Sequence, residues 1–180
     1  MLVSCGLSIV RSDDGREWVF RPSFGRIAEL GHPHEIVQTF AALHGPHAAE
    51  TARFVLLTLC DTDAMPLTGW LEDGAFVPGL QPAGESIILA RHLMQHGVCG
   101  KPDFAGHGGK FSPEFHASEY IASAVVHFGM TQAEAEGLSM TQFQELFAQK
   151  FPKAIKAKPP SRDEYREFMA AIKAKKQKAA

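Results

Sequence analysis

The apolar positions of residues 113–152 predict three consecutive helices. The first is expected to begin at or just before Ser118 and to end at Gly129, a residue type that commonly follows a helix. Its apolar residues recur every three or four positions, at Ile121, Ala124, Val125 and Phe128. This spacing is typical of an amphipathic helix that buries one face.

The sequence also predicts where the second and third helices of this stretch begin. Thr131 followed by Glu134 is a capping box and predicts a short helix. Ser139 or Thr141 is expected to begin the third helix, and Pro152 to stop it. Its apolar stripe consists of Phe143, Leu146, Phe147 and Phe151. The pattern indicates packing or docking rather than chemistry.

The first third of the chain predicts a small β-hairpin followed by helices. Residues 2–10 and 16–21 are rich in β-forming side chains, and Asp14-Gly15 between them is a typical hairpin turn. Proline and glycine then separate three helical segments. These are residues 23–30, a helix from Pro33 to the break at Gly45, and an apolar helix with Pro46 in its first turn that ends near Cys60.

The middle of the chain predicts a second small hairpin and one more helix. Thr68–Leu71 and Ala75–Pro78 are the expected strands, with Asp and Gly in the turn between them. A helix is expected over Gly84–His96 and is predicted to stop at Gly97. Residues 98–115 are rich in glycine and are expected to form a long loop.

The C-terminal residues predict a linker and a detached helix. Residues 153–160 are rich in lysine and proline, and Ser161 with Glu164 forms a further capping box. The stripe that follows lies on one helix face and consists of Tyr165, Phe168, Met169 and Ile172. The sequence therefore predicts a mainly α protein with a multi-helix domain at 1–152, which includes the N-terminal β-hairpin. A linker at 153–160 leads to a basic amphipathic tail helix at 161–180.

Charge is distributed unevenly along the chain. The formal net charge is −2, but residues 153–180 hold nine of the 18 basic residues and three acids, a balance of +6 against −8 for the rest. An acidic body with a basic tail favours electrostatic association with another protein, with a second copy or with nucleic acid. The alternative is that a lysine-rich helix end is simply solvated and favoured by the helix dipole.

Composition narrows the class of protein. The 45% of hydrophobic residues and 21% of charged ones are ordinary for a globular domain, and no apolar run has the roughly 18 residues of a membrane span. The three cysteines are few and widely spaced, which favours reduced thiols in a cytosolic setting. No cofactor and no membrane partner are expected.

The histidines raise the hypothesis of a metal site. His92 and His96 are four residues apart on a predicted helix, with Cys99, His107 and His116 later in the sequence. The pair lacks the glutamate of a metalloprotease helix, since residues 93–95 are Leu, Met and Gln. Surface or helix-end histidines are the simpler interpretation.

Other candidate chemistry is weaker still. Cys60 ends an apolar helix and is expected to be a small core residue. Asp61 and Asp63 could act as acid and base, but Asp-Thr-Asp after a helix is usually a cap or turn. Residues 106–110 resemble a phosphate loop only in composition. Residues 131–147 could form a helix-turn-helix, although the second helix offers no basic face, so nucleic-acid binding is not favoured.

Two blocks of the sequence resemble small proteins encoded in the tail-gene clusters of long-tailed bacteriophages. They are FRPSFGRIAELGHPHEIVQTFAALHG at 20–45 and FHASEYIASAVVHFGMTQAEAEGLSMTQFQELFAQKFP at 115–152. The resemblance is to tail assembly chaperones and implies a non-enzymatic protein in the cytoplasm of the infected bacterial host. It implies tape-measure and tail-tube proteins as partners, self-association as a further option, and no catalytic residues. The apolar stripes are then the candidate partner-binding residues: Tyr165, Phe168, Met169, Ile172, Phe143 and Phe147.

Three alternatives remain open. In the same setting, the chain would be a structural component of the virion tail or of the head–tail connector. From other classes, it would be a DNA-binding regulator or a small metal-dependent enzyme. The tail stripe at residues 165–172 either docks on a partner or completes the chain's own core.

Overall fold

The computed structural model describes residues 6–101 and 112–152 of the chain, and it is mainly helical with two small antiparallel hairpins. The predicted fold class and the N-terminal hairpin are confirmed. The linker at 153–160 and the tail helix at 161–180 lie outside the described residues, as does most of the glycine-rich loop. In chain order the elements are β1 (Ser8–Arg11), β2 (Glu17–Phe20), α1 (Phe24–Ala28), α2 (Pro33–Ala42), α3 (Ala48–Leu59), α4 (Met65–Thr68), β3 (Trp70–Glu72), β4 (Ala75–Val77), α5 (Ala83–Met94), the π-helix η2 (Gln95–Cys99), α6 (Ala117–Phe128), α7 (Gln132–Glu136) and α8 (Met140–Lys150).

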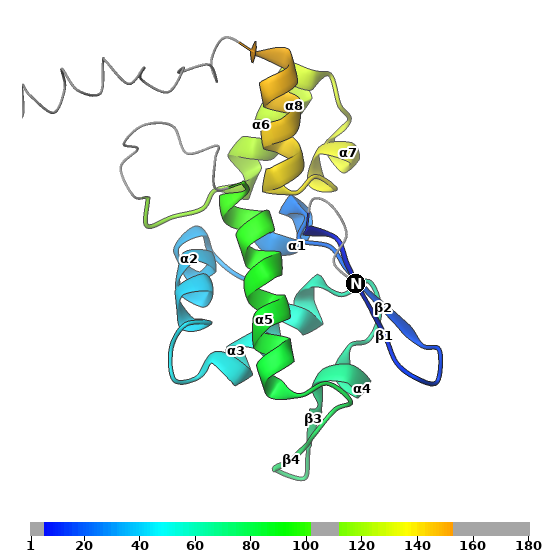
Figure 1. Cartoon of the computed structure of the whole chain (residues 1–180). Helices are drawn as coiled ribbons and strands as arrows, with labels where there is room; N and C mark the ends of the chain where they lie inside the picture. The colour runs from blue at the N-terminus through cyan, green and yellow to red at the C-terminus, as the bar shows by residue number, and fades with distance from the viewer. Residues whose placement is uncertain (1–5, 102–111, 153–180) are drawn as a thin grey trace, which may run out of the picture.

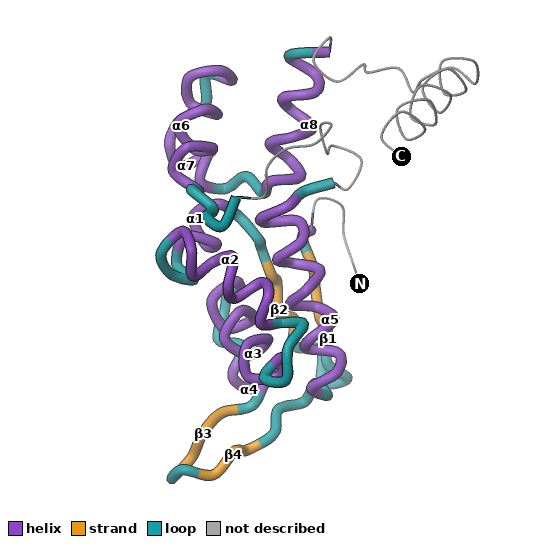
Figure 2. Tube along the Cα trace, turned by 90° about the vertical axis from the view of Figure 1, so that its left-hand side faces the viewer, coloured by secondary structure: helices purple, strands orange, loops and turns teal. Residues whose placement is uncertain are grey.

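The long axis of the molecule follows α5, η2 and α8 (Figure 1). α3 packs along α5, α1 contacts α3, α6 and α7, and η2 packs on the start of α8. Both views place the β3–β4 hairpin at one end of the molecule and the tip of α8 at the other (Figures 1 and 2). No helix of the described part is long and apolar enough to cross a membrane.

One hydrophobic core joins the helices. Ile27 of α1, Leu56 of α3 and Leu93 of α5 are each fully buried in it. Burial of an aliphatic side chain of this size contributes about 1.5–3 kcal/mol. The other fully buried large apolar residues are Phe20, Phe24, Ile36, Leu43, Val55, Leu59 and Met94.

The β1–β2 hairpin is attached to the end of α3. Its strands pair antiparallel with Ser8 opposite Phe20, and Phe20 forms an isolated bridge with Cys60. The Trp18 indole Nε1 donates a hydrogen bond to the Asp63 carbonyl at 3.0 Å. β1 begins at Ser8 and extends one residue beyond its predicted end, and β2 lies within its predicted range; residues 2–5 of the first predicted strand lie outside the described residues. The turn at Asp14-Gly15 is confirmed.

The three predicted C-terminal helices are confirmed, together with their caps. The Thr131 and Ser139 side chains accept hydrogen bonds from the third residue of α7 and α8, and both capping boxes are complete. Gly129 ends α6 with a left-handed φ of 70°. The helices meet in an aromatic cluster in which the ring centroids of Tyr120 and Phe143 lie 5.5 Å apart.

Two sequence predictions about helix ends are wrong. The helix predicted to stop at Gly97 continues through it as η2 and ends at Gly100, whose φ is 76°. A Cβ on Gly97 would lie 2.7 Å from Ile27 Cδ1, so this glycine permits close packing instead of ending the helix. Pro46 lies before the α3 N-cap His47 and so outside the first turn.

A short helix in the middle of the chain was not predicted. α4 begins at Met65 with Ala64 as its N-cap, and just before it Asp63 Oδ1 accepts a hydrogen bond from Met65 N at 2.8 Å, the contact of an Asx turn. Thr68, predicted to start a strand, is instead the last residue of α4, and its hydroxyl donates to the Ala64 carbonyl at 3.0 Å. The second hairpin is otherwise confirmed: its first strand lies one to two residues later than predicted, and its second strand begins at Ala75 as predicted and ends one residue earlier, at Val77.

Candidate functional site

The β3–β4 hairpin presents the most exposed cross-strand pair of large apolar residues in the described part of the chain. Its register places Leu71 directly opposite Phe76, so both side chains lie on one face. Leu71 is 69% exposed and Phe76 is 49% exposed. Asp73 and Gly74 in the turn have φ angles of 49° and 81°, which match the two-residue turn that tightly pairs such strands.

The base of the hairpin forms a shallow cavity against α3. The Arg53 guanidinium stacks over the Phe76 ring at 4.1 Å from its centroid. This cation–π contact restrains the Phe76 ring. Phe76, Arg53 and the 57%-exposed Leu80 line a cavity of about 280 Å³. We define Leu71, Phe76 and Leu80 as the hairpin surface. Contiguous exposed apolar patches are candidates for binding surfaces.

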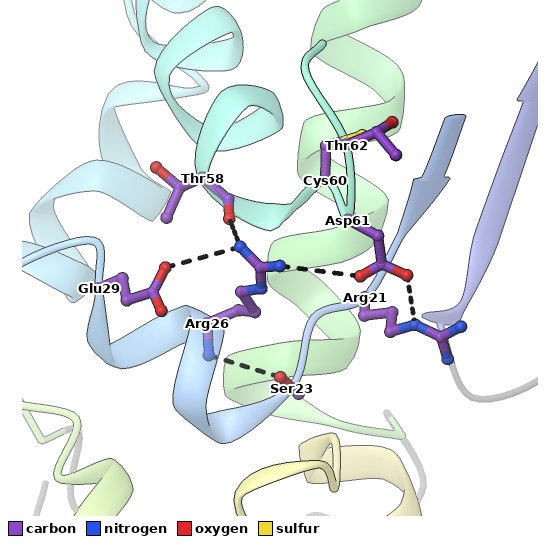
Figure 3. Close-up of polar contacts among 8 residues, drawn as sticks. All are labelled: Arg21, Ser23, Arg26, Glu29, Thr58, Cys60, Asp61 and Thr62. Carbon is purple, nitrogen blue, oxygen red and sulfur yellow. Dashed lines mark hydrogen bonds and ion pairs between the residues drawn. The ribbon is translucent and has the colours of Figure 1, made fainter. Parts of the chain in front are cut away.

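Charged groups gather where β2, α1 and α3 meet (Figure 3). The Asp61 carboxylate pairs with Arg21 at 2.6 Å and with Arg26 at 3.9 Å. Arg26 also donates a hydrogen bond to the Thr58 carbonyl at 3.3 Å and pairs with Glu29 at 3.8 Å. The arginine therefore satisfies a free carbonyl at the end of α3, which is a structural task. The interpretation of Asp61 as an acid or base is not needed to explain its position.

A histidine pair lies on the last turns of α5 and in η2. The ring centroids of His92 and His96 are 4.5 Å apart, and His96 Nδ1 is 2.7 Å from the Thr141 hydroxyl of α8. His92 Nε2 is buried and has no hydrogen-bond partner among the described residues. Partial burial lowers the pKa of both imidazoles because it disfavours the charged form. Neutral histidines here are well suited to packing between helices.

The metal hypothesis gains no third ligand from the described residues. In residues 6–101 and 112–152, no three or more His, Cys, Asp or Glu side chains come together in a way that could hold an ion. The Cys99 thiol has a raised pKa because its surroundings partly desolvate it, which disfavours the thiolate that a metal needs. His107 lies outside the described residues, and His116 pairs instead with Glu114 at 2.9 Å.

The remaining cysteine and the helix-turn-helix candidate have structural contacts. Cys60 is buried, as predicted, and its Sγ is 3.8 Å from the Thr62 hydroxyl. In α8, the Gln144 side chain accepts from Lys101 N at 2.8 Å and donates to the Cys99 carbonyl at 3.0 Å. The second helix of the candidate motif thus uses part of its polar face to hold η2.

The six predicted partner-binding residues fall into two groups. Phe143 is buried at 9% exposure within the aromatic cluster, and Phe147 is partly buried with its ring 6.3 Å from Phe143. Both contribute to internal packing, and their binding to a partner stays a prediction. The other four lie outside the described residues: Tyr165, Phe168, Met169 and Ile172.

Sequence reasoning missed the hairpin surface as a site. The turn residues predicted the strands, but a single sequence does not tell which face of a two-stranded hairpin is covered. The signal that could have revealed this surface was the position of Leu71 and Phe76 on either side of a tight turn, with the apolar Leu80 a few residues later.

Comparison with known proteins places the chain in one family. No curated protein and no solved structure matches it at a significant level. A family model described as a family of unknown function, DUF6246, matches residues 44–167. The match includes the hairpin surface, the histidine pair and the three C-terminal helices. Because it spans more than half of the chain, the protein belongs to the DUF6246 family.

Proposed function

We propose that this protein is a phage tail assembly factor that acts by binding other polypeptides, in the manner of a chaperone, through its hairpin surface. The client is a helical polypeptide with an apolar face, and the tape-measure and tail-tube proteins are the candidates. The reaction class is non-covalent binding. The observation that carries the proposal is the exposed Leu71–Phe76 pair at one end of the molecule.

Three features support a binding role for this surface. Leu71, Phe76 and Leu80 are all around half exposed or more, yet they are large apolar residues. The short turn and the Arg53 contact hold the pair in a fixed position, which lowers the entropy cost of binding. The hairpin lies at one end of the molecule in both views, so a long client can approach it from outside (Figures 1 and 2).

The phage setting is supported by the sequence resemblance of residues 20–45 and 115–152. Those two blocks supply α1, α2 and the helices α6–α8, which form much of the frame. In the sequence, the hairpin surface lies between these two blocks. The residues proposed to select the client and the helices that support the fold therefore come from different parts of the chain.

Co-expression of the chain with proteins encoded by neighbouring genes tests the proposal. The full chain is produced together with the tape-measure or tail-tube protein of the same gene cluster. We expect the client to stay in the supernatant and to co-purify with the chain. A client that precipitates equally with and without the chain, and never co-purifies, contradicts the proposal. Detection of the chain in purified particles would instead favour the virion-component alternative.

A further inference from the structure

The hairpin surface continues into a groove that borders the β1–β2 turn. Residues 80–82 line the cavity of about 280 Å³ at the base of the β3–β4 hairpin, and they also line this groove, which has a volume of about 410 Å³. The groove adds apolar side chains from Val10 and Leu67. Because the exposed Leu80 belongs to both, a client that packs over Leu80 meets one continuous apolar surface.

Three exposed carboxylates border this continuous surface. Asp73 lies in the turn of the β3–β4 hairpin, and Asp13 and Glu85 line the groove. None of the three forms an ion pair with another residue of the described part of the chain. Their negative charges are therefore available to a partner.

The basic residues nearby do not cancel these charges. Arg11 also lines the groove, but it pairs with Glu17 at 2.5 Å. Arg16 of the β1–β2 turn pairs with Asp14 at 2.6 Å. Arg53 is stacked over the aromatic ring at the base of the β3–β4 hairpin and contributes one positive charge. A single guanidinium does not balance three carboxylates, so the surface keeps a net negative charge.

Charge at the rim of an apolar surface selects among partners that have similar apolar faces. Opposite charges speed the encounter and fix its register, whereas like charges placed against each other disfavour the wrong partner. Lysine and arginine also lay their methylene stems along apolar surface while their charged ends stay in water. A helix with basic residues beside its apolar stripe therefore matches this surface, and an acidic helix does not.

We propose that the client segment bound at the hairpin surface is a basic amphipathic helix. Its apolar face packs on the hairpin surface, as in other complexes where an amphipathic helix lies in a groove. Its flanking lysine or arginine side chains lie against Asp13, Asp73 and Glu85. The inference rests on the proposed client-binding function and adds the chemistry that the client must have.

Two synthetic helical peptides of about 18 residues test the inference on the full chain. The peptides share one leucine face, and the positions that flank this face are lysine in one peptide and glutamate in the other. Fluorescence anisotropy of the labelled peptides gives their affinities. We expect the basic peptide to bind at least about tenfold more tightly at low salt, and the difference to shrink at high salt. Equal affinities, or tighter binding of the acidic peptide, overturn the inference.

A pair of matched variants locates the effect on this surface. Asp73→Asn/Glu85→Gln should weaken binding of the basic peptide about fivefold at low salt, because it removes two rim charges. Asparagine tolerates the positive φ of position 73. The control Glu119→Gln/Glu136→Gln removes the same charge from α6 and α7, at the other end of the molecule, and should bind like the wild type (Figure 1). Equal weakening by both variants overturns the assignment to this surface. Melting temperatures equal to the wild type identify variants that are correctly folded.

A further variant distinguishes failure of this inference from failure of the proposed function. Leu71→Ser/Phe76→Ser should abolish binding of the basic peptide. Unchanged binding would contradict both the proposed function and the inference. Weaker binding of both peptides, with no difference between the two in the wild type, would keep the hairpin surface as the site and overturn only the inference about charge. Self-association of the chain that Asp73→Asn/Glu85→Gln abolishes would make a second copy the occupant and would also overturn the inference.

Discussion

His96 Nδ1 lies 2.7 Å from the Thr141 hydroxyl, and this contact joins η2 to α8. It is reinforced by Gln144 of α8, whose amide contacts the backbone of Cys99 and Lys101. The helices at residues 117–150 are thus fixed to the long axis of the molecule through polar contacts at one π-helical turn. Such turns are often found at functional sites, but here the turn serves as a joint.

The histidine pair predicts that the fold is sensitive to acid. Burial lowers the pKa of His92 and His96, and for His96 the neighbouring His92 and Lys101 act in the same direction. The pKa in the folded state thus lies below the unfolded value of about 6.5, so the unfolded chain binds more protons as the pH falls through that value. Stability is fully present above about pH 6.5 and is lost as the pH falls toward the folded pKa.

Thermal melts across this range check the acid sensitivity. We expect the melting temperature to fall between about pH 7.5 and about pH 5.5. The variant His92→Gln should show a smaller slope, while Val126→Ala, which changes an exposed residue that does not titrate, should keep the wild-type slope. Identical slopes for His92→Gln and wild type would contradict this account.

The aromatic cluster predicts a large stability loss at Phe143. Its ring contacts those of Phe24, Tyr120 and Phe128, with centroids 5.5 to 6.0 Å apart. The variant Phe143→Ala should lower the free energy of unfolding by about 3–5 kcal/mol, because it removes a buried ring and leaves a cavity. Urea unfolding measures the change. The control Val126→Ala, at a position 76% exposed, should stay within about 0.5 kcal/mol of the wild type. A loss below that of a surface change would show that Phe143 is not in the core.

The Asp61 contacts predict a smaller and salt-dependent effect. Asp61→Asn should lower the free energy of unfolding by about 1 kcal/mol, because its ion pairs with Arg21 and Arg26 are only partly buried. The loss should shrink at high salt. A double-mutant cycle with Arg21→Gln isolates the pair. No coupling between the two positions at low salt would mean that the contact contributes nothing to stability.

Local chemistry made much of the fold predictable from sequence. The capping boxes at Thr131 and Ser139 and the turn at Asp73-Gly74 depend on neighbouring residues, so a single sequence contains them. The extension of α5 through Gly97 depends on how closely Ile27 approaches from α1, which no local pattern reveals.

The candidate site was less predictable, for the same reason. The sequence marked Phe143 as part of an amphipathic stripe, but a stripe packs equally well on its own core or on a partner. Its burial depends on Phe24 of α1, whose ring centroid lies 6.0 Å from that of Phe143. Conversely, Leu71 and Phe76 stay exposed because the contact that reaches this face of the hairpin, from Arg53 of α3 onto Phe76, leaves much of it uncovered.

The affinity of the full chain for its client, compared between two matched variants, tests the central claim most directly. Leu71→Ser/Phe76→Ser removes the exposed pair of the hairpin, and Ile88→Ser/Val126→Ser removes two exposed apolar residues elsewhere. Isothermal titration against the co-purifying tail protein should show at least about a tenfold loss of affinity for the hairpin variant. The control variant should bind like the wild type, and both should melt like it. Equal affinity of the hairpin variant and the wild type would contradict a hairpin-mediated function.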